Sequence, residues 1–249
     1  MDFLKENPQE AVCYTADKKN FPYGPRGKEE LSSILITLTE KLLKTVNPKI
    51  IVLACNTATI SAIASMRQNF PQVPFVGTVP ALKPAAVSSG NAKIGVLGTE
   101  RTIEEIRGLH LVDDTCEIFG VAAPELVEFV ELRFNKANQN EKNEIVKKYI
   151  DKFRTENVKT IVLGCTHFLF LLEEFRREAV PNIKIFDSLD GITKRIEFLL
   201  DENDGALRCE KKIKPARELL LNGTDTEDSF WQNFAQTNGF NFALLDEKL

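Results

Sequence analysis

Several residue types are scarce in this chain of 249 residues, and each scarcity excludes a class of protein. The chain has two histidines, His110 and His167, which excludes a histidine-rich metal centre. It has one Trp and three Tyr, and its acidic residues outnumber its basic ones by 36 to 32. A nucleic-acid-binding protein typically has a basic excess and aromatic side chains on which bases stack. We therefore predict no nucleic-acid partner.

Long apolar runs are also missing. No run approaches the roughly 18 apolar residues that a membrane span requires. The first residues, MDFLKENPQE, lack the cationic start and apolar stretch of a secretory signal. These absences predict a cytoplasmic protein without a membrane partner. In a reducing cytosol its cysteines are expected to be free thiols, and no CxxC spacing indicates a structural zinc site. The five cysteines are Cys13, Cys55, Cys116, Cys165 and Cys209.

Apolar runs alternate with stretches of helical period along the chain. Lys49–Ala54 and Lys159–Gly164 are nearly continuous apolar runs, which is typical of strands buried on both faces. Lys28–Thr45 carries its apolar residues at helical spacing. The further predicted strands are Ala11–Thr15, Pro74–Gly77, Lys93–Gly98, Glu117–Val121 and Ile183–Phe186, and the further helices are Thr57–Phe70, Leu126–Phe134, Glu141–Thr155 and Phe168–Glu178. This alternation predicts an α/β protein with parallel sheets.

One internal repeat is visible in the sequence. Residues 47–58 read NPKIIVLACNTA and residues 157–168 read NVKTIVLGCTHF, an offset of 110 residues. The same offset pairs FVGT at 75–78 with IFDS at 185–188. Two buried strands can share a generic apolar pattern, but burial does not require the shared Asn, Lys and Cys. We therefore predict a duplicated α/β unit in which each copy ends a strand in a cysteine.

The repeat also shows a gap at the start of the chain. The second copy contains the strand IGVLGTERT from Ile94, and its counterpart at the same offset would precede Met1. The first half is therefore expected to be without its opening strand.

Cys55 and Cys165 follow these strands, where open α/β sheets bind their ligands. Each thiol is expected at a helix N-terminus, which lowers a thiol pKa and binds anions. Short polar residues follow each cysteine, namely Asn56, Thr57 and Thr166, and they suit capping or the binding of a carboxylate. His167 is placed to orient the Cys165 thiol or to exchange a proton with it.

Three chemistries could use two thiols that face one cleft. A redox disulfide is one, although catalytic redox pairs usually form a short CxxC. A Cys–His nucleophile is the second, but it leaves Cys55 without a role. The third is two-base proton exchange at a carbon centre, in which one thiolate removes a proton and the opposite thiol delivers one. Quasi-symmetric halves suit this last chemistry, because the two enantiomers of a substrate are mirror images.

The sequence resembles the glutamate racemases of the aspartate/glutamate racemase superfamily. The matching segments are ADKKNFPYGPRGKEEL, LACNTA, FVGTVPALKPAA, IGVLGTERTI, APELVEFVE and LGCTHFLFL. The resemblance implies two similar parallel-sheet α/β domains with pseudo-twofold symmetry and an active-site cleft between them. It places 1–80 plus 189–249 in the first domain and 81–188 in the second. It also implies a small-molecule substrate, glutamate, with no cofactor and no metal, and a homodimer, since dimers are common in the family.

The resemblance assigns roles residue by residue. It implies that the catalytic residues are Cys55, Cys165, His167 and Glu131, with Glu131 assisting near the second cysteine. It implies that the substrate-binding residues are Tyr23, Gly24, Asn56, Thr57, Thr166 and His167. The expected reaction is cofactor-independent conversion of L-glutamate to D-glutamate by two-base proton transfer, which supplies D-glutamate for peptidoglycan and so for cell-wall biogenesis and cell shape.

The chain departs from the family pattern at its start. The family opens with a strand that ends in an Asp-Ser-Gly motif, and no such motif precedes Tyr14. A start codon assigned too late, a trimmed chain and a loss of activity are the competing explanations, of which we favour the first. If the chain is complete, we expect weak or absent racemisation and a first sheet without a central strand. The alternative functions are another racemase or isomerase of the superfamily, acting on aspartate or a hydantoin, and a catalytically weak amino-acid-binding protein.

Overall fold

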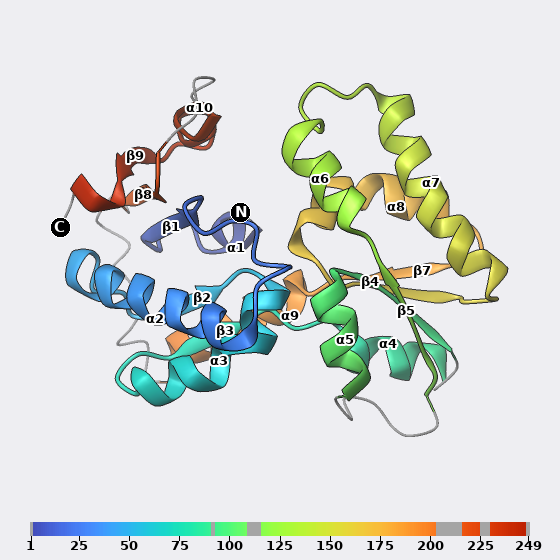
Figure 1. Cartoon of the computed structure of the whole chain (residues 1–249), viewed down its shortest axis with the longest axis horizontal. Helices are drawn as coiled ribbons and strands as arrows, with labels where there is room; N and C mark the ends of the chain where they lie inside the picture. Colours follow the sequence, from blue (N-terminus) through green and yellow to red (C-terminus); the bar gives the residue numbers. More distant parts are fainter. Residues whose placement is uncertain (1, 91–92, 109–115, 203–215, 225–229, 248–249) are drawn as a thin grey trace. The chain divides into compact units, whose positions relative to one another are not determined.

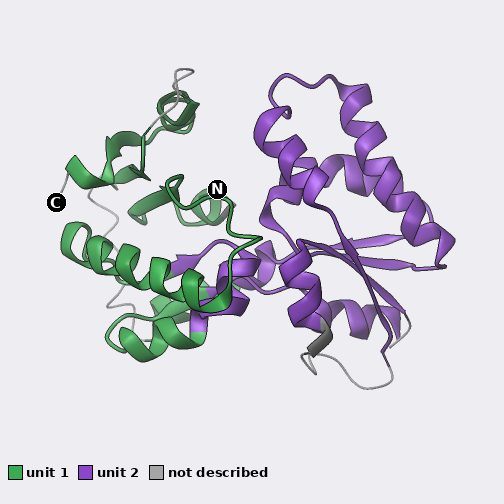
Figure 2. Ribbon diagram, viewed as in Figure 1, with its two compact units in different colours: residues 1–51, 64–76, 193–249 green, residues 52–63, 77–192 purple. Residues whose placement is uncertain are grey.

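The computed structural model describes every residue except 1, 91–92, 109–115, 203–215, 225–229 and 248–249 (Figure 1). His110 and Cys209 lie outside the described residues. The chain divides into unit 1, residues 1–51, 64–76 and 193–249, and unit 2, residues 52–63 and 77–192 (Figure 2). The predicted domains, 1–80 plus 189–249 and 81–188, stay a prediction, and each unit is considered by itself.

Unit 2 contains a four-stranded parallel sheet in the order β5-β4-β6-β7. Its strands are β4 (Ile94–Gly98), β5 (Ile118–Ala122), β6 (Thr160–Leu163) and β7 (Lys184–Phe186). Each lies within a residue or two of the strand predicted from the sequence. The α/β class with parallel sheets is confirmed.

Side chains alternate between the two faces of this sheet, as the pleat of a strand requires. Val96 and Val162 pack on one face with helices α4 (Leu82–Ser89) and α5 (Glu100–Gly108). Leu97, Ile161 and Leu163 pack on the other face. That face is covered by α6 (Pro124–Leu132), α7 (Gln139–Thr155), η1 (Thr166–Leu171) and α8 (Leu172–Ala179). Both faces are therefore buried, which explains the continuous apolar runs of β4 and β6.

Helix α7 approaches the sheet closely. A Cβ atom added to Gly95 of β4 would lie 2.6 Å from the ring of Phe153, which is fully buried. The start of α7 is a capping box, in which Asn138 accepts from the N–H of Glu141 and the Glu141 side chain accepts from the N–H of Asn138. The capped start and the ring packed over Gly95 set the position of this helix on the sheet.

Unit 1 contains a three-stranded parallel sheet in the order β1-β8-β9. Its strands are β1 (Val12–Asp17), β8 (Arg217–Asn222) and β9 (Asn241–Leu244). Leu219 of β8 is fully buried in a core that Leu4, Ala235 and Phe240 share. Helices α1 (Asp2–Glu6) and α10 (Phe230–Thr237) contribute to this core, and η2 (Leu245–Glu247) follows β9.

The remaining elements include the strand that leads to the first cysteine. Strands β2 (Ile51–Leu53) and β3 (Phe75–Gly77) form a two-stranded sheet. Helix α2 (Lys28–Thr45) has the predicted bounds and buries Leu31, Leu35 and Thr39 at helical spacing. Helices α3 (Asn56–Asn69) and α9 (Leu189–Asp201) complete the list.

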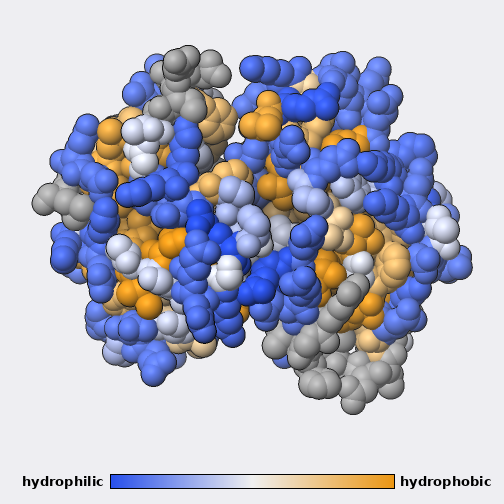
Figure 3. Space-filling view, in the orientation of Figure 1, coloured by the Kyte–Doolittle hydropathy of each residue, from blue (hydrophilic) through white to orange (hydrophobic). Residues whose placement is uncertain are grey.

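The described helices include none that is both long and apolar enough to span a membrane. On the face shown in Figure 3, hydrophilic side chains separate the groups of apolar ones.

Candidate active site

Cys55 lies in unit 2, between the end of β2 and the start of α3. Its carbonyl oxygen accepts a hydrogen bond of 2.9 Å from the N–H of Thr59, which begins the helix. Burial of the sulfur raises the pKa of the Cys55 thiol to about 11. Hydrogen bonds from the N–H groups of Ala58 and Thr57 lower the pKa, and a charge on Cys165 raises it. Cys55 is therefore a protonated thiol at neutral pH.

The two residues after Cys55 are buried and polar. Asn56 is 2% exposed, and neither atom of its amide has a hydrogen-bond partner among the described residues. A buried polar atom without a partner costs about 1–3 kcal/mol, so two such atoms on one side chain indicate a place for a polar ligand. The Thr57 hydroxyl lies 3.1 Å from that of Thr99 and 3.4 Å from that of Thr102.

Cys165 occupies the equivalent position after β6. It is 8% exposed and begins the 3-10 helix η1 from an extended backbone conformation. The preceding Gly164 donates its N–H to the carbonyl of Leu97 at 2.7 Å, and an added Cβ would lie 3.1 Å from that oxygen. A glycine therefore allows the chain to turn out of the sheet closely enough to place the thiol at its edge.

His167 links Cys165 to an acidic residue. Its Nδ1 lies 3.6 Å from Sγ of Cys165, and its Nε2 lies 2.6 Å from Oε1 of Glu131 at the end of α6. Burial lowers the pKa of His167, but the hydrogen bonds with Cys165 and Glu131 outweigh it and raise the pKa to about 10. His167 is therefore an imidazolium at neutral pH, and a negative charge on Cys165 contributes to its raised pKa.

One hydrogen bond joins the two cysteine motifs. The Thr166 hydroxyl donates to the carbonyl oxygen of Ala54 at 3.2 Å, so the residue after the second cysteine bonds to the residue before the first. Unit 2 thus holds every predicted site residue of both motifs together with Glu131. These residues are Cys55, Asn56, Thr57, Glu131, Cys165, Thr166 and His167. Their roles as catalytic or substrate-binding residues stay predictions.

Tyr23 and Gly24, the other predicted substrate contacts, lie in unit 1 between β1 and α2. The Tyr23 hydroxyl donates to Oδ2 of Asp17 at 2.5 Å. No sequence pattern had singled out Asp17, Thr99 or Thr102 as site residues. Their position in the sequence could have indicated two of them, because Asp17 and Thr99 stand where strands β1 and β4 end.

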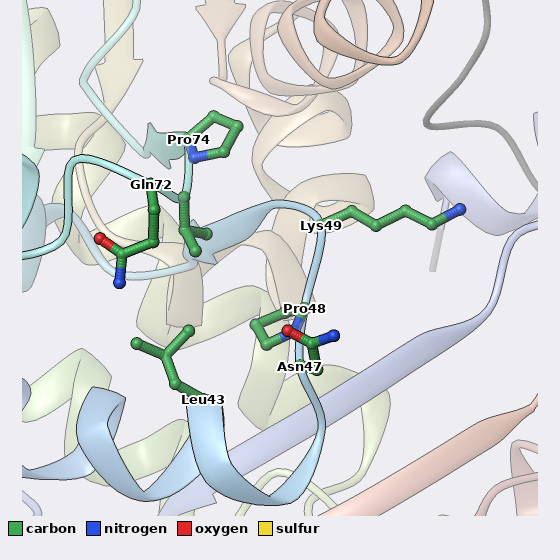
Figure 4. A pocket seen from close by; sticks show the side chains of 7 residues that line it. Leu43, Asn47, Pro48, Lys49, Gln72 and Pro74 are labelled. Carbon is green, nitrogen blue, oxygen red and sulfur yellow. The ribbon is translucent and has the colours of Figure 1, made fainter.

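A pocket of about 430 Å³ lies elsewhere in unit 1, before the first residues of β2 and β3 (Figure 4). Its lining consists of Leu43, Asn47, Pro48, Lys49, Gln72, Val73 and Pro74. None of the predicted site residues is among them.

Comparisons with known proteins identify the family of this chain. A sequence model of the Asp/Glu/Hydantoin racemase family matches residues 5–195. A glutamate racemase of Ectopseudomonas mendocina is 32% identical over 200 residues, which cover 79% of this chain and 75% of that one. A glutamate racemase of Clostridium acetobutylicum is 33% identical over 204 residues, with coverages of 81% and 78%.

Solved structures show the same likeness. Glutamate racemase isoform RacE1 from Bacillus anthracis matches with a TM-score of 0.78 and 26% identity, over 98% of this chain and 90% of that one. The Escherichia coli glutamate racemase in complex with L-glutamate and activator has a TM-score of 0.81 at 24% identity, with coverages of 97% and 90%. Since the family match covers most of the sequence, and both cysteine motifs lie within it, the chain belongs to the Asp/Glu/Hydantoin racemase family.

Proposed function

We propose that this protein interconverts L- and D-glutamate by moving a proton between the α-carbon and two thiols, Cys55 and Cys165. Relatives named glutamate racemase support the substrate. The observation that carries the mechanism is the joining of two cysteine-bearing strand ends by the Thr166–Ala54 hydrogen bond. A Cys–His nucleophile would explain only one of these two thiols.

The chemistry of the two thiols supports opposite protonation states. A charge on Cys165 raises the pKa of Cys55, so ionising one thiol disfavours ionising the other. Two-base exchange needs one thiolate as base and one thiol as acid. Nδ1 of the His167 imidazolium lies 3.6 Å from Sγ of Cys165, while the raised pKa of Cys55 keeps that thiol protonated.

Proton transfer takes place in two steps. The thiolate takes the α-proton as the Cα–H bond breaks, and the electron pair spreads into the adjacent carboxylate. The other thiol then gives its proton to the opposite face of the α-carbon and becomes the thiolate. The unpartnered amide of Asn56 and the hydroxyls of Thr57 and Thr166 are proposed to bind the polar groups of glutamate.

The test is hydrogen–deuterium exchange at the α-carbon. Purified protein should replace the α-proton of L- and of D-glutamate with deuterium in D2O, without added cofactor, as followed by proton NMR. The double variant Cys55→Ala, Cys165→Ala should lose this exchange. Cys116→Ala is a matched control, because Cys116 is another partly buried cysteine of unit 2 outside any disulfide, and it should be dispensable. Exchange that persists in the double variant would exclude the two-thiol mechanism.

Aspartate and hydantoins are the second candidate substrates, because the matched family model includes their racemases. The same NMR assay with L-aspartate and a hydantoin distinguishes the three. Faster exchange of either compound than of glutamate would reassign the substrate and keep the mechanism.

We further propose that the D-glutamate serves peptidoglycan synthesis in the cytoplasm, and that the protein is a homodimer. Expression of the chain in a bacterium that requires D-glutamate should permit growth without it, and the double cysteine variant should not. Sedimentation of the purified protein tests the assembly. A monomer that is fully active would contradict the homodimer alone.

A further inference from the structure

Asp17 is the last residue of β1 and lies in register with Asn222, the last residue of β8. Three side chains donate hydrogen bonds to its carboxylate. Asn222 donates to Oδ1 at 2.6 Å, and Asn20 donates to both oxygens at 3.0 Å. The Tyr23 hydroxyl donates to Oδ2 at 2.5 Å, which is the length typical of a hydroxyl bonded to a carboxylate. One carboxylate therefore joins the end of the sheet to the loop that carries Tyr23.

The backbone of this loop has supports that do not involve Asp17. The N–H of Lys19 donates to the carbonyl of Asn222 at 2.9 Å, and the N–H of Arg26 donates to the carbonyl of Tyr23 at 3.1 Å. The Arg26 side chain also donates to the carbonyl of Asn20 at 2.7 Å. Gly223 lies against the same loop, since a Cβ added there would be 3.1 Å from the nitrogen of Lys19.

These two sets of contacts have different roles. The backbone bonds set the path of the loop, whereas the bond to Asp17 sets the direction of the Tyr23 ring. All three donors need an acceptor, and an ionised carboxylate offers only acceptors. An asparagine at position 17 would present an amide to these donors and could satisfy fewer of them.

We infer that Asp17 is a positioning residue, which acts on the substrate through Tyr23 and does not take part in proton transfer. This inference rests on the proposed function and on the substrate contact that the family resemblance predicts for Tyr23. It predicts that loss of the Asp17 carboxylate weakens substrate binding and leaves the thiol chemistry in place. The effect should therefore appear in KM and not in kcat.

The experiment is a double-mutant cycle in the full chain with Asp17→Asn, Tyr23→Phe and the double variant. Each single variant should raise the KM for glutamate about tenfold, the size expected for a lost hydrogen bond to a charged group, and change kcat less than about threefold. The double variant should be no worse than either single one, because both remove the same contact. Multiplying effects, near 100-fold in KM for the double variant, would overturn the inference.

The matched control is Glu40→Gln. Glu40 is an exposed carboxylate of unit 1 on α2, so the change removes a negative charge and leaves the loop contacts named above in place. It should leave KM unchanged. An equal rise in KM for Glu40→Gln would show that the Asp17 effect is one of charge or of general stability.

A measurement that does not depend on enzyme activity tests this inference separately from the proposed function. Protein labelled with 3-fluorotyrosine gives a fluorine NMR signal for Tyr23, assigned by its absence in Tyr23→Phe. Asp17→Asn should shift that signal while amide exchange at Lys19 and Arg26 stays as in the wild type. An unmoved signal would overturn the positioning role, whereas an inactive wild type with a shifted signal would overturn only the proposed function.

Discussion

The two cysteine motifs share a sequence pattern and differ in their electrostatics. Cys55 precedes the α-helix α3 and is hydrogen-bonded by the backbone N–H groups of Ala58 and Thr57 and by the Thr57 side chain. Cys165 precedes the 3-10 helix η1 and has an imidazolium and a carboxylate beside it. Both thiols follow strands, yet only the second has a cation within hydrogen-bonding distance among the described residues.

This difference shows how two copies of a repeated sequence can carry unequal thiols. The strand and the cysteine recur in both copies of the repeat. The charges beside Cys165 come from His167, where the first copy has Thr57, and from Glu131, which lies outside the repeat. Glu131 belongs to α6, which has no counterpart in the quoted repeat, and it contributes to the raised pKa of His167. We expect the two thiols to share one reaction and to be distinguishable by experiment.

Single cysteine variants should give the largest effect. Cys55→Ala and Cys165→Ala should each reduce inversion by about 100-fold or more, because each removes one of the two proton-transfer groups. Each should still exchange the α-proton of one enantiomer in D2O, and the two variants should act on opposite enantiomers. Proton NMR on enantiopure L- and D-glutamate measures this. Exchange of the same enantiomer by both variants would contradict facing thiols.

The second largest effect is expected in alkylation, which should proceed at different rates for the two thiols. A pKa of about 11 in place of 9.0 leaves Cys55 with about 100-fold less thiolate at pH 8. A short iodoacetamide pulse with mass spectrometry should therefore label Cys55 much more slowly in the folded protein than in urea. Cys165→Ala should speed the labelling of Cys55, because a nearby charge is removed. An unchanged rate in that variant would show that the two sulfurs do not interact.

Glu131→Gln should have a smaller effect, limited to the proton exchange that depends on Cys165. It removes the anion beside His167 and lowers the pKa of that histidine. Exchange by the Cys55→Ala variant, which depends on Cys165, should fall about tenfold, within the usual range for an acid–base group. Exchange by Cys165→Ala should change less than about twofold on the same scale.

The control for this change is Glu128→Gln, an exposed glutamate on the same helix. The comparison must use the rates of α-proton exchange and not kcat/KM. The two enantiomers have equal free energies, so kcat/KM is the same in both directions. Equal losses in the two single-cysteine backgrounds would mean that Glu131 supports the whole site and not one thiol.

The smallest expected effect is on stability. His167 has a pKa of about 10 in the folded protein against 6.5 when unperturbed, so its contribution is full below pH 6.5 and is lost as the pH rises toward 10. The free energy of unfolding in urea should fall on the order of 1 kcal/mol between pH 7 and pH 9.5. His167→Asn should flatten this fall. A wild-type curve that rises with pH would contradict the raised pKa.

Much of the fold could be predicted from the sequence, because burial on both faces produces continuous apolar runs. The range of α2 was predicted at its observed bounds, and β4 and β6 within a residue. Helices α4, α5 and α9 were not predicted. Of these, α4 carries Pro84, and α5 is short and largely polar, with Ile103 and Ile106 as its only aliphatic residues. The predicted helix Phe168–Glu178 is instead η1 followed by α8, because a 3-10 turn does not follow the helical period.

The site was predicted in part. The cysteine motifs and Glu131 were found because short motifs and a resemblance mark them, and the structure places them in one unit. Asp17 and the hydroxyls of Thr99 and Thr102 were missed. Their importance depends on which side chain reaches them in space, as Tyr23 reaches Asp17 and Thr57 reaches Thr99, and sequence order does not reveal such partners.

The hydrogen bond from Thr166 to Ala54 has a consequence for how this chain can vary. It ties together two turns that are encoded 110 residues apart. An insertion or deletion in either turn would move one thiol relative to the other, so neither turn can change its length alone. Neighbouring loops without such a hydrogen bond can change in length, and insertions and deletions in related sequences should occur mainly in them.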